Sequence, residues 1–252
     1  MRICYVVPGA MSQGPMGVTE MRRREGLLQE WAFAGTTVTL VDVANGVKSI
    51  ESAYEELLAA PGAIDRIRDL EEKGLDAAII GCFGDPGLEA ARELVSMPVV
   101  GPGEASLLLG AQLGHRMTIL SVFDSLAASH RHQAFRAGVL DKLASVRGLN
   151  IPVLELMRNP DATFAQIVET GRRAIEEDRA EVLIFGCMTM SFLGVAPKLS
   201  EALGVPVINA AQAALKAAES LVSIKLSHSK KAFPLPPKLQ EAKVAATRMR
   251  AV

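Results

Sequence analysis

Aromatic residues, excess charge of one sign and long apolar runs are all scarce in this chain of 252 residues. Phe, Trp and Tyr make up 4% of it, which argues against a stacking platform for single-stranded nucleic acid. The formal net charge is −1, so nothing draws the chain as a whole toward nucleic acid or an anionic membrane. Glycine or charged residues interrupt every apolar run before it reaches membrane-spanning length. We therefore expect neither nucleic acid nor a membrane as a partner.

Cysteine is also rare, with only Cys4, Cys82 and Cys187 in the chain. The N-terminal residues read as a short strand followed by Pro8-Gly9, and not as a secretion signal. An odd number of thiols in such a chain is typical of reduced cysteines rather than of a disulfide framework. The sequence thus predicts a cytoplasmic protein, and its 49% of apolar residues predicts a substantial core.

Short segments rich in Val and Ile alternate with segments of helical period. The expected strands are Ile3–Val7, Val38–Val43, Ala77–Cys82, Pro98–Val100, Met117–Val122, Pro152–Leu156, Val182–Cys187 and Pro206–Ile208. Helical spacing runs from Phe164 to Ile175, with Asp161 near its start, and from Ile64 to Leu70, with Gly74 as its stop. Strands that are apolar on both faces and joined by helices predict an α/β fold with covered parallel sheets.

One pattern occurs twice along the chain. The segment from Ala78 to Cys82 matches the segment from Leu183 to Cys187, and the two cysteines are 105 residues apart. Pro98-Val99-Val100 then matches Pro206-Val207-Ile208, each followed by an Ala-rich helix, and the 36 residues from Arg2 to Val38 match the 36 from Arg116 to Pro152. Two copies indicate a duplicated unit rather than a solenoid.

The repeat predicts two similar parallel-sheet α/β domains related by pseudo-two-fold symmetry. We expect residues 1–104 plus 210–252 to form the first half with a C-terminal helix and tail, and residues 105–209 to form the second. The polar, Pro-punctuated tail from Lys225 reads as a peripheral strap or an oligomer contact. Ligands of parallel sheets bind at the carboxyl ends of the strands. The active site is therefore expected in the cleft between the halves.

Cys82 and Cys187 each close an apolar strand directly after a glycine. Core packing does not require the same thiol at two equivalent strand ends, whereas Cys4 lies mid-strand without a matching cysteine and is expected to be structural. After Cys82, Asp85 and Pro86 read as the N-cap and first residue of a helix, and a helix N-terminus lowers the pKa of a nearby thiol. These features predict that Cys82 and Cys187 are catalytic.

Two thiols suit the inversion of an acidic carbon, which needs a base on one face and a proton donor on the other. The backbone N–H groups of Phe83, Gly84, Met188 and Thr189 are candidates to stabilise the charge of the carbanion. These four residues are therefore expected to contribute to substrate binding.

Several stretches resemble the aspartate/glutamate/hydantoin racemase superfamily, and within it the hydantoin racemase branch. They are Gly81 to Leu88, Pro98 to Ser106, Ser49 to Tyr54, Gly186-Cys187 and Gly204 to Ile208. The resemblance implies two four-stranded α/β domains with the site between them, no metal or organic cofactor, and a homo-oligomer. It also implies that Ser49 and Ile50 lie near the substrate. Pro8 stands at the exit of the first strand, where the family usually has an Asn-rich turn, and is a further candidate.

The leading hypothesis is a cofactor-independent racemase or epimerase that acts on a small molecule, a 5-substituted hydantoin or a related cyclic ureide. A decarboxylase or a cis–trans isomerase of the same fold is the nearest alternative, although related decarboxylases resemble one-cysteine versions. A non-catalytic two-lobed binding protein for a small molecule is the alternative from another class.

Three other features have simpler interpretations. The glycines around Gly101 lack the last position of the dinucleotide fingerprint. His130 and His132 point to opposite sides of a helix, which argues against a shared metal and predicts solvated or interface side chains. Arg22-Arg23-Arg24, flanked by Glu20 and Glu25, is expected to form a solvated helix face.

Overall fold

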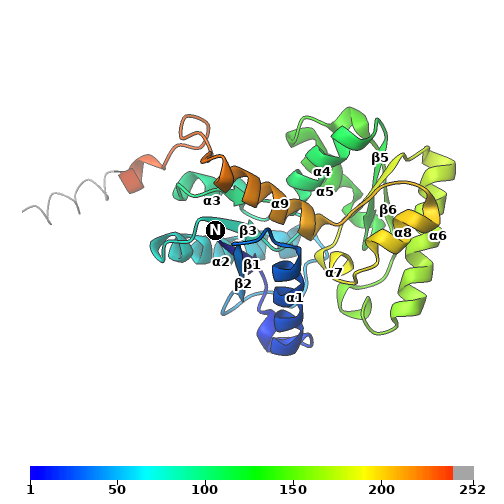
Figure 1. Ribbon diagram of the computed structural model, residues 1–252, viewed down its shortest axis with the longest axis horizontal. Helices are drawn as coiled ribbons and strands as arrows, with labels where there is room; N and C mark the ends of the chain where they lie inside the picture. Colours follow the sequence, from blue (N-terminus) through cyan, green and yellow to red (C-terminus); the bar gives the residue numbers. More distant parts are fainter. Residues whose placement is uncertain (241–252) are drawn as a thin grey trace, which may run out of the picture.

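The chain forms two lobes, each built on a four-stranded parallel sheet, in the computed structural model, which describes residues 1–240 (Figure 1). In the first lobe the strand order is β2-β1-β3-β4, and in the second it is β6-β5-β7-β8. The strands are β1 Arg2–Val7, β2 Thr37–Asp42, β3 Ala77–Ile80, β4 Val99–Val100, β5 Met117–Ser121, β6 Leu143–Gly148, β7 Val182–Phe185 and β8 Val207–Ile208. The predicted α/β fold with two parallel sheets is confirmed.

The two sheets repeat the same order and nearly the same register. Val6 pairs with Ile80 in the first sheet, and Leu120 pairs with Phe185 at the equivalent point of the second. This agrees with the duplicated pattern in the sequence. The proposed domain boundaries remain a prediction, and residues 241–252 lie outside the described residues.

One predicted strand is wrong. Residues 152–156 do not form a strand, because Val153–Glu155 is a short 3-10 helix (η4), and the second strand of the repeat is β6 instead. Asn150 has a positive φ of 56°, which breaks the extended backbone, and Pro152 has no N–H to donate to a sheet. The match of 36 residues between Arg116 and Pro152 was therefore accidental.

Helices cover both faces of each sheet. The α-helices are α1 Gly17–Trp31, α2 Ala53–Glu72, α3 Leu88–Leu94, α4 Pro102–Leu113, α5 Ala127–Arg136, α6 Pro160–Asp178, α7 Met188–Ser191, α8 Ala196–Leu203 and α9 Ala210–Ser223. Short 3-10 segments are η1 Met11–Gln13, η2 Asp124–Leu126 and η3 Leu140–Lys142. The predicted helices around Ile64 and Phe164 are present as α2 and α6.

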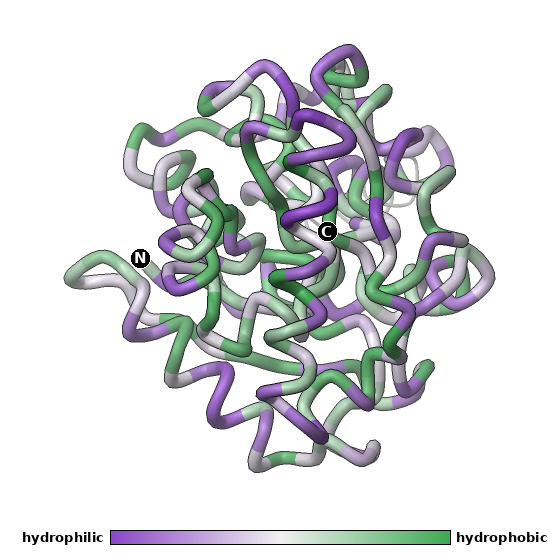
Figure 2. The backbone as a smooth tube through the Cα atoms, turned by 90° about the vertical axis from the view of Figure 1, so that its right-hand side faces the viewer, coloured by the Kyte–Doolittle hydropathy of each residue, from purple (hydrophilic) through white to green (hydrophobic). Residues whose placement is uncertain are grey.

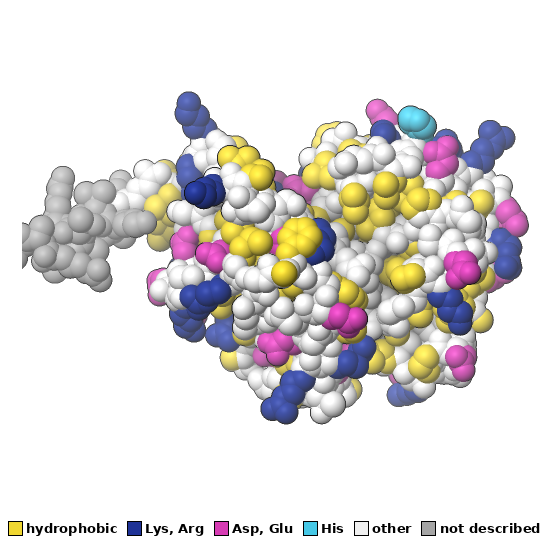
Figure 3. Space-filling view, in the orientation of Figure 1, with side chains coloured by type: hydrophobic (Ala, Val, Ile, Leu, Met, Phe, Trp, Pro, Cys, Tyr) yellow, Lys and Arg dark blue, Asp and Glu magenta, His cyan; other side chains and the backbone are white. Residues whose placement is uncertain are grey.

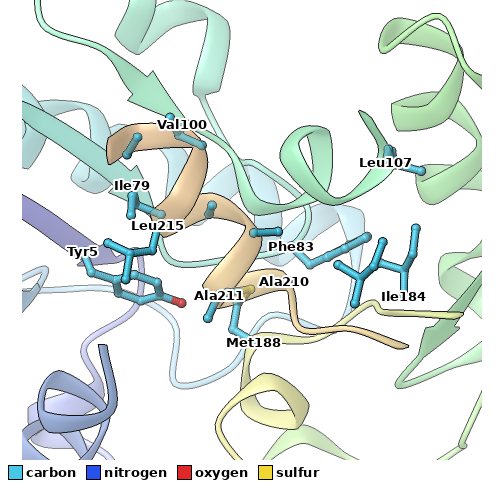
Figure 4. Close-up of a cluster of buried hydrophobic side chains, with 14 of the residues drawn as sticks. Tyr5, Ile79, Phe83, Val100, Leu107, Ile184, Met188, Ala210, Ala211 and Leu215 are labelled. Atoms are coloured by element: carbon cyan, nitrogen blue, oxygen red, sulfur yellow. The ribbon is translucent and has the colours of Figure 1, made fainter. Parts of the chain in front are cut away.

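The largest apolar cluster runs from one lobe into the other. Ile79 of β3 and Ile184 of β7 belong to the same cluster, and Ala211 and Leu215 of α9 pack within it (Figure 4). Apolar and polar segments alternate along the backbone when the molecule is viewed from the second lobe (Figure 2). Helix α9 follows the last strand of the second sheet. It contacts β3, β4 and α1 of the first lobe and α7 of the second, so it joins the two lobes.

A C-terminal strap follows α9 and closes one edge of the first sheet. Within it, His228 Nε2 accepts a hydrogen bond from the Val99 N–H of β4 at 2.9 Å. Lys230 Nζ donates to the carbonyl oxygens of Arg92 and Val95, at the end of α3, at 2.7 and 2.6 Å. A cation at a helix C-terminus also interacts favourably with the helix dipole. The strap therefore fixes β4 and α3 together.

The surface has a furrow between the lobes, with apolar side chains on both of its sides in the view of Figure 3. A groove lined by α4, β8 and α9 includes the partly exposed side chains of Leu108, Leu109 and Leu113. Over residues 1–240, none of the helices combines the length and the apolar character needed to span a bilayer.

Candidate active site

A glycine precedes each of the two central thiols for the same steric reason. A Cβ at Gly81 would lie 2.5 Å from Tyr5 Cε1 and 2.9 Å from the Val6 oxygen. A Cβ at Gly186 would lie 2.6 Å from Ile119 Cγ2 and 3.0 Å from the Leu120 oxygen. The N–H groups of both glycines donate to those same carbonyl oxygens, at 2.7 and 2.8 Å. The strand ends thus turn in the same way and direct Cys82 and Cys187 to one place.

The loop after Cys82 is fixed by Asp85, although not in the predicted manner. Helix α3 begins at Leu88, with Gly87 as its N-cap at a φ of 75°, so Asp85 does not cap it. Its carboxylate instead accepts hydrogen bonds from the N–H groups of Gly103 and Glu104, at 2.9 and 2.8 Å, in the first turn of α4. Burial raises the pKa of Asp85 to about 7, although both hydrogen bonds favour its ionised form. This loop is therefore attached to the start of α4.

Cys187 is the N-cap residue of the short helix α7. The N–H groups of Thr189 and Met190 and the Thr189 hydroxyl lie near its thiol and lower its pKa. At Cys82, the Gly84 N–H has the same effect. The N–H groups of Gly84 and Thr189 thus favour a thiolate at each cysteine, and their part in binding the substrate remains a prediction.

Burial acts in the opposite direction and is the larger effect at both thiols. It raises the pKa of Cys187, and together with the neighbouring Glu56 it raises the pKa of Cys82 further. The predicted fall of the thiol pKa toward neutral pH is therefore not found, because burial outweighs the effect of the N–H groups. Cys4 is fully buried on β1, outside the pocket, as expected for a structural cysteine.

The nine predicted site residues all line one pocket. They are Pro8, Ser49, Ile50, Cys82, Phe83, Gly84, Cys187, Met188 and Thr189. Residues from both lobes contribute to it, and each lobe supplies one thiol. Cys187 is 9% exposed, and Cys82 is more exposed than that. The geometry brings the predicted residues together, and their catalytic and binding roles remain a prediction.

The sequence interpretation missed several charged and polar residues of the pocket. Arg22 and Arg23 are exposed, as expected for a solvated helix face, but Arg24 is only 4% exposed and Glu20 only 7%. Arg24 Nε donates to Glu20 at 2.8 Å, and its Nη2 donates to Thr189 Oγ1 in the second lobe at 3.1 Å. Lys48 and Glu56 also line the pocket. The sequence around Arg24 resembles an ordinary exposed charged helix. Its burial depends on Thr189, which is far away along the chain, so no local pattern predicts it.

His130 is likewise a pocket residue and not a solvated one. Its side chain is 2% exposed, and burial lowers its pKa, so the neutral ring is favoured. The Nε2 atom lies 3.1 Å from Ser121 Oγ, and Nδ1 lies 3.0 Å from Gln133 Oε1. Gln133 Nε2 in turn donates to the carbonyl oxygen of Phe83 at 2.6 Å. This chain of hydrogen bonds connects the second lobe with the loop that carries Cys82.

In the part of the chain that the structure describes, no group of three or more His, Cys, Asp or Glu side chains is placed to hold a metal ion.

Known proteins resemble this chain over most of its length. The family model for Asp/Glu/Hydantoin racemase matches residues 18–218. A hydantoin racemase of Pseudomonas sp. (strain NS671) is 37% identical over 208 residues, covering 82% of this chain and 83% of the relative. A hydantoin racemase of Paenarthrobacter aurescens is 33% identical, covering 91% and 94% of the two chains. Among solved structures, allantoin racemase from Klebsiella pneumoniae has a TM-score of 0.86 and 32% identity, and covers 94% of both chains.

Proposed function

The chain belongs to the Asp/Glu/hydantoin racemase family, and we propose that this racemase inverts the carbon beside a carbonyl in a 5-substituted hydantoin or a related cyclic ureide. Cys82 and Cys187 would exchange the proton, without a cofactor. The observation that carries the proposal is that equivalent strands of the two lobes each deliver a thiol to the same pocket. The related hydantoin and allantoin racemases support it, because both named substrates contain a cyclic ureide with an acidic C–H bond.

The reaction begins with one cysteine as a thiolate and the other as a thiol. The thiolate takes the proton from the ring carbon, so that the C–H bond breaks, an S–H bond forms and the electron pair spreads into the adjacent carbonyl. The opposite thiol then gives its proton to the other face of the carbon. This leaves the second sulfur as the thiolate and the substrate inverted. A planar intermediate between two proton carriers explains why one pocket needs both thiols.

The two walls of the pocket suit a ureide ring that carries an apolar substituent. The first lobe supplies the charged side chains of Arg24, Lys48 and Glu56, and the carboxylate of Glu56 can accept a hydrogen bond from a ring N–H. The second lobe supplies an apolar wall, consisting of Val122, Leu126 and Val153. We expect the ring to face the first lobe and the substituent to face the second.

The test follows the optical rotation of single enantiomers of 5-benzylhydantoin and 5-isobutylhydantoin in deuterated buffer. An enzyme-free sample measures the spontaneous racemisation of the compounds. The proposal predicts a faster loss of rotation with the enzyme, and deuterium at the inverted carbon of the product. Cys82→Ala and Cys187→Ala should each abolish inversion, because each removes one of the two proton carriers.

Cys4→Ala is the matched control, since Cys4 lies outside the pocket. It should retain racemisation, which shows that loss of activity in the other variants is not a general effect of replacing a cysteine. Inversion that persists in Cys82→Ala or Cys187→Ala would overturn the two-thiol mechanism. No loss of rotation above the enzyme-free sample for either enantiomer of either compound would overturn the substrate assignment.

A further inference from the structure

The two thiols occupy equivalent positions, but their charged neighbours are not equivalent. Among the described residues, the charged side chains that line the pocket are Arg24 of α1, Lys48 of the β2–α2 loop and Glu56 of α2, all from the first lobe. The second lobe contributes apolar side chains and His130, whose neutral form is favoured by burial. The two lobes are therefore similar in fold, but only the first places charged side chains in the described pocket.

Arg24 is held beside Cys187 by contacts on several sides. Its Nε donates to Glu20 at 2.8 Å, its Nη2 donates to Thr189 Oγ1 at 3.1 Å, and its guanidinium carbon lies 4.9 Å from the centre of the Phe192 ring. Thr189 is the second residue after Cys187 and lines the same pocket. The guanidinium therefore shares the pocket with Cys187 and is fixed to the second residue after it, and its positive charge lowers the pKa of Cys187.

Glu56 has the opposite relation to Cys82. A Cβ at Gly84 would overlap the Glu56 carboxyl group, so this group lies directly against the backbone two residues after Cys82. Within residues 1–240, no side-chain hydrogen bond or ion pair neutralises the Glu56 carboxylate. Its negative charge raises the pKa of Cys82, and the charges of Asp85 and Cys187 act in the same direction.

We infer that Arg24 and Glu56 assign different roles to the two cysteines, so that in the free enzyme Cys187 carries the thiolate and Cys82 carries the proton. The catalytic consequence rests on the proposed racemisation. The free enzyme is then ready for the enantiomer whose C–H bond points to Cys187. Turnover of that enantiomer leaves the thiolate on Cys82, beside Glu56, and a proton on Cys187. The enzyme returns to its first state when Cys82 takes up a proton and Cys187 releases one.

Site-resolved alkylation tests this assignment without any substrate. Iodoacetamide reacts with thiolates, and mass spectrometry of digested protein gives the rate at Cys82 and at Cys187 separately. Rates measured over a range of pH give an apparent pKa for each thiol. Exposure alone favours reaction at Cys82, because Cys187 is the more buried of the two. We expect the lower apparent pKa, and near neutral pH the faster reaction, at Cys187.

Two charge-removing variants test the cause. Arg24→Met should raise the apparent pKa of Cys187 by about one unit, which slows its alkylation about tenfold near neutral pH, and should leave Cys82 little changed. Glu56→Gln should lower the apparent pKa of Cys82 by a similar amount and leave Cys187 little changed. Arg24→Lys keeps the positive charge and should retain most of the wild-type difference. It also serves as the readout should Arg24→Met fail to fold.

The outcomes separate this inference from the proposed function. An apparent pKa at Cys82 that equals or lies below that of Cys187 in the wild type overturns the assignment, whether or not the enzyme racemises hydantoins. Unchanged pKa values in both Arg24→Met and Glu56→Gln overturn the roles of these residues. If the order and both shifts are found but no hydantoin racemises, the assignment stands and the substrate proposal fails.

Discussion

The Glu51 carboxylate of the first lobe accepts a hydrogen bond from the Val153 N–H of the second lobe at 2.8 Å. Glu51 precedes Ser52, the N-cap of α2; the Glu55 N–H donates to Ser52 Oγ, and the Glu55 carboxylate accepts from the Ser52 hydroxyl and the Glu51 N–H. Val153 is the first residue of η4 and lines the pocket. The start of α2 is therefore linked to the opposite wall of the pocket, close to Ser49 and Ile50.

Removing this link should weaken substrate binding more than the chemical step. A hydrogen bond to a charged acceptor contributes about 1.5–3 kcal/mol, so we expect Glu51→Ala to raise KM at least about tenfold and to change kcat less. Glu51→Gln keeps an acceptor for the Val153 N–H and should stay near the wild-type KM. Steady-state kinetics on one hydantoin enantiomer measure both values. Equal KM values for wild type, Glu51→Ala and Glu51→Gln would show that the contact has no part in binding.

Leu126 should determine the preference for the substituent of the ring. It is 7% exposed and belongs to the apolar wall of the pocket. Loss of its side chain removes apolar contact worth about 1–3 kcal/mol per methylene group of the ligand. We expect Leu126→Ala to lower kcat/KM about tenfold or more for 5-isobutylhydantoin and clearly less for 5-methylhydantoin. The matched control is Leu140→Ala, a partly buried leucine outside the pocket. An equal loss for both substrates would contradict this placement of the substituent.

Asp85 should make the protein less stable as the pH rises through the weakly acidic range. Its pKa is about 7 in the folded chain and 3.8 as the ordinary value, so between these pH values the folded state binds a proton that the unfolded state has released. Raising the pH across this window therefore favours unfolding. In Asp85→Asn this contribution is absent. Chemical denaturation at several pH values should show the stability of the variant, relative to the wild type, increasing from about pH 4 to about pH 7. A relative stability that stays flat or decreases would refute the raised pKa.

His228 should have the opposite pH dependence. Burial lowers its pKa to about 4 from an ordinary 6.5, so between these values the unfolded chain binds a proton that the folded chain does not. Lowering the pH through this window favours unfolding, since a protonated ring cannot accept the Val99 N–H. We expect His228→Gln to lose less stability than the wild type between about pH 6.5 and pH 4. Limited proteolysis should also show the wild-type strap becoming cleavable over this range. Identical acid profiles for the two proteins would rule out this role.

Local sequence patterns predicted the features that depend on neighbouring residues. The apolar runs that end in Gly81-Cys82 and Gly186-Cys187 identified the two strands and the two thiols, because both the strand and the requirement for glycine are set within a few residues. The β6 strand was missed because Leu143–Gly148 is a partly exposed edge strand that contains Arg147, whereas the more apolar segment after Pro152 resembles a strand.

Features that depend on contacts between the lobes could not be predicted in the same way. Arg24 is buried because α1 packs near α7 of the second lobe, where Thr189 and Phe192 receive its guanidinium group. Glu56 stands on α2 with nothing in its neighbourhood along the chain to distinguish it from the exposed acidic residues of that helix. Its position becomes apparent only with the Gly84 loop against it.

The C-terminal strap also protects the protein from association through strand addition. An uncovered edge strand offers free N–H and C=O groups that can pair with a strand of another molecule. β4 is the outer strand of its sheet, and the imidazole of His228 occupies its Val99 N–H. The same contact weakens in acid, so a fall in pH would expose the buried Val99 and Val100 at an unpaired edge. Acid would therefore make this short edge of the first sheet more accessible to a strand of another molecule.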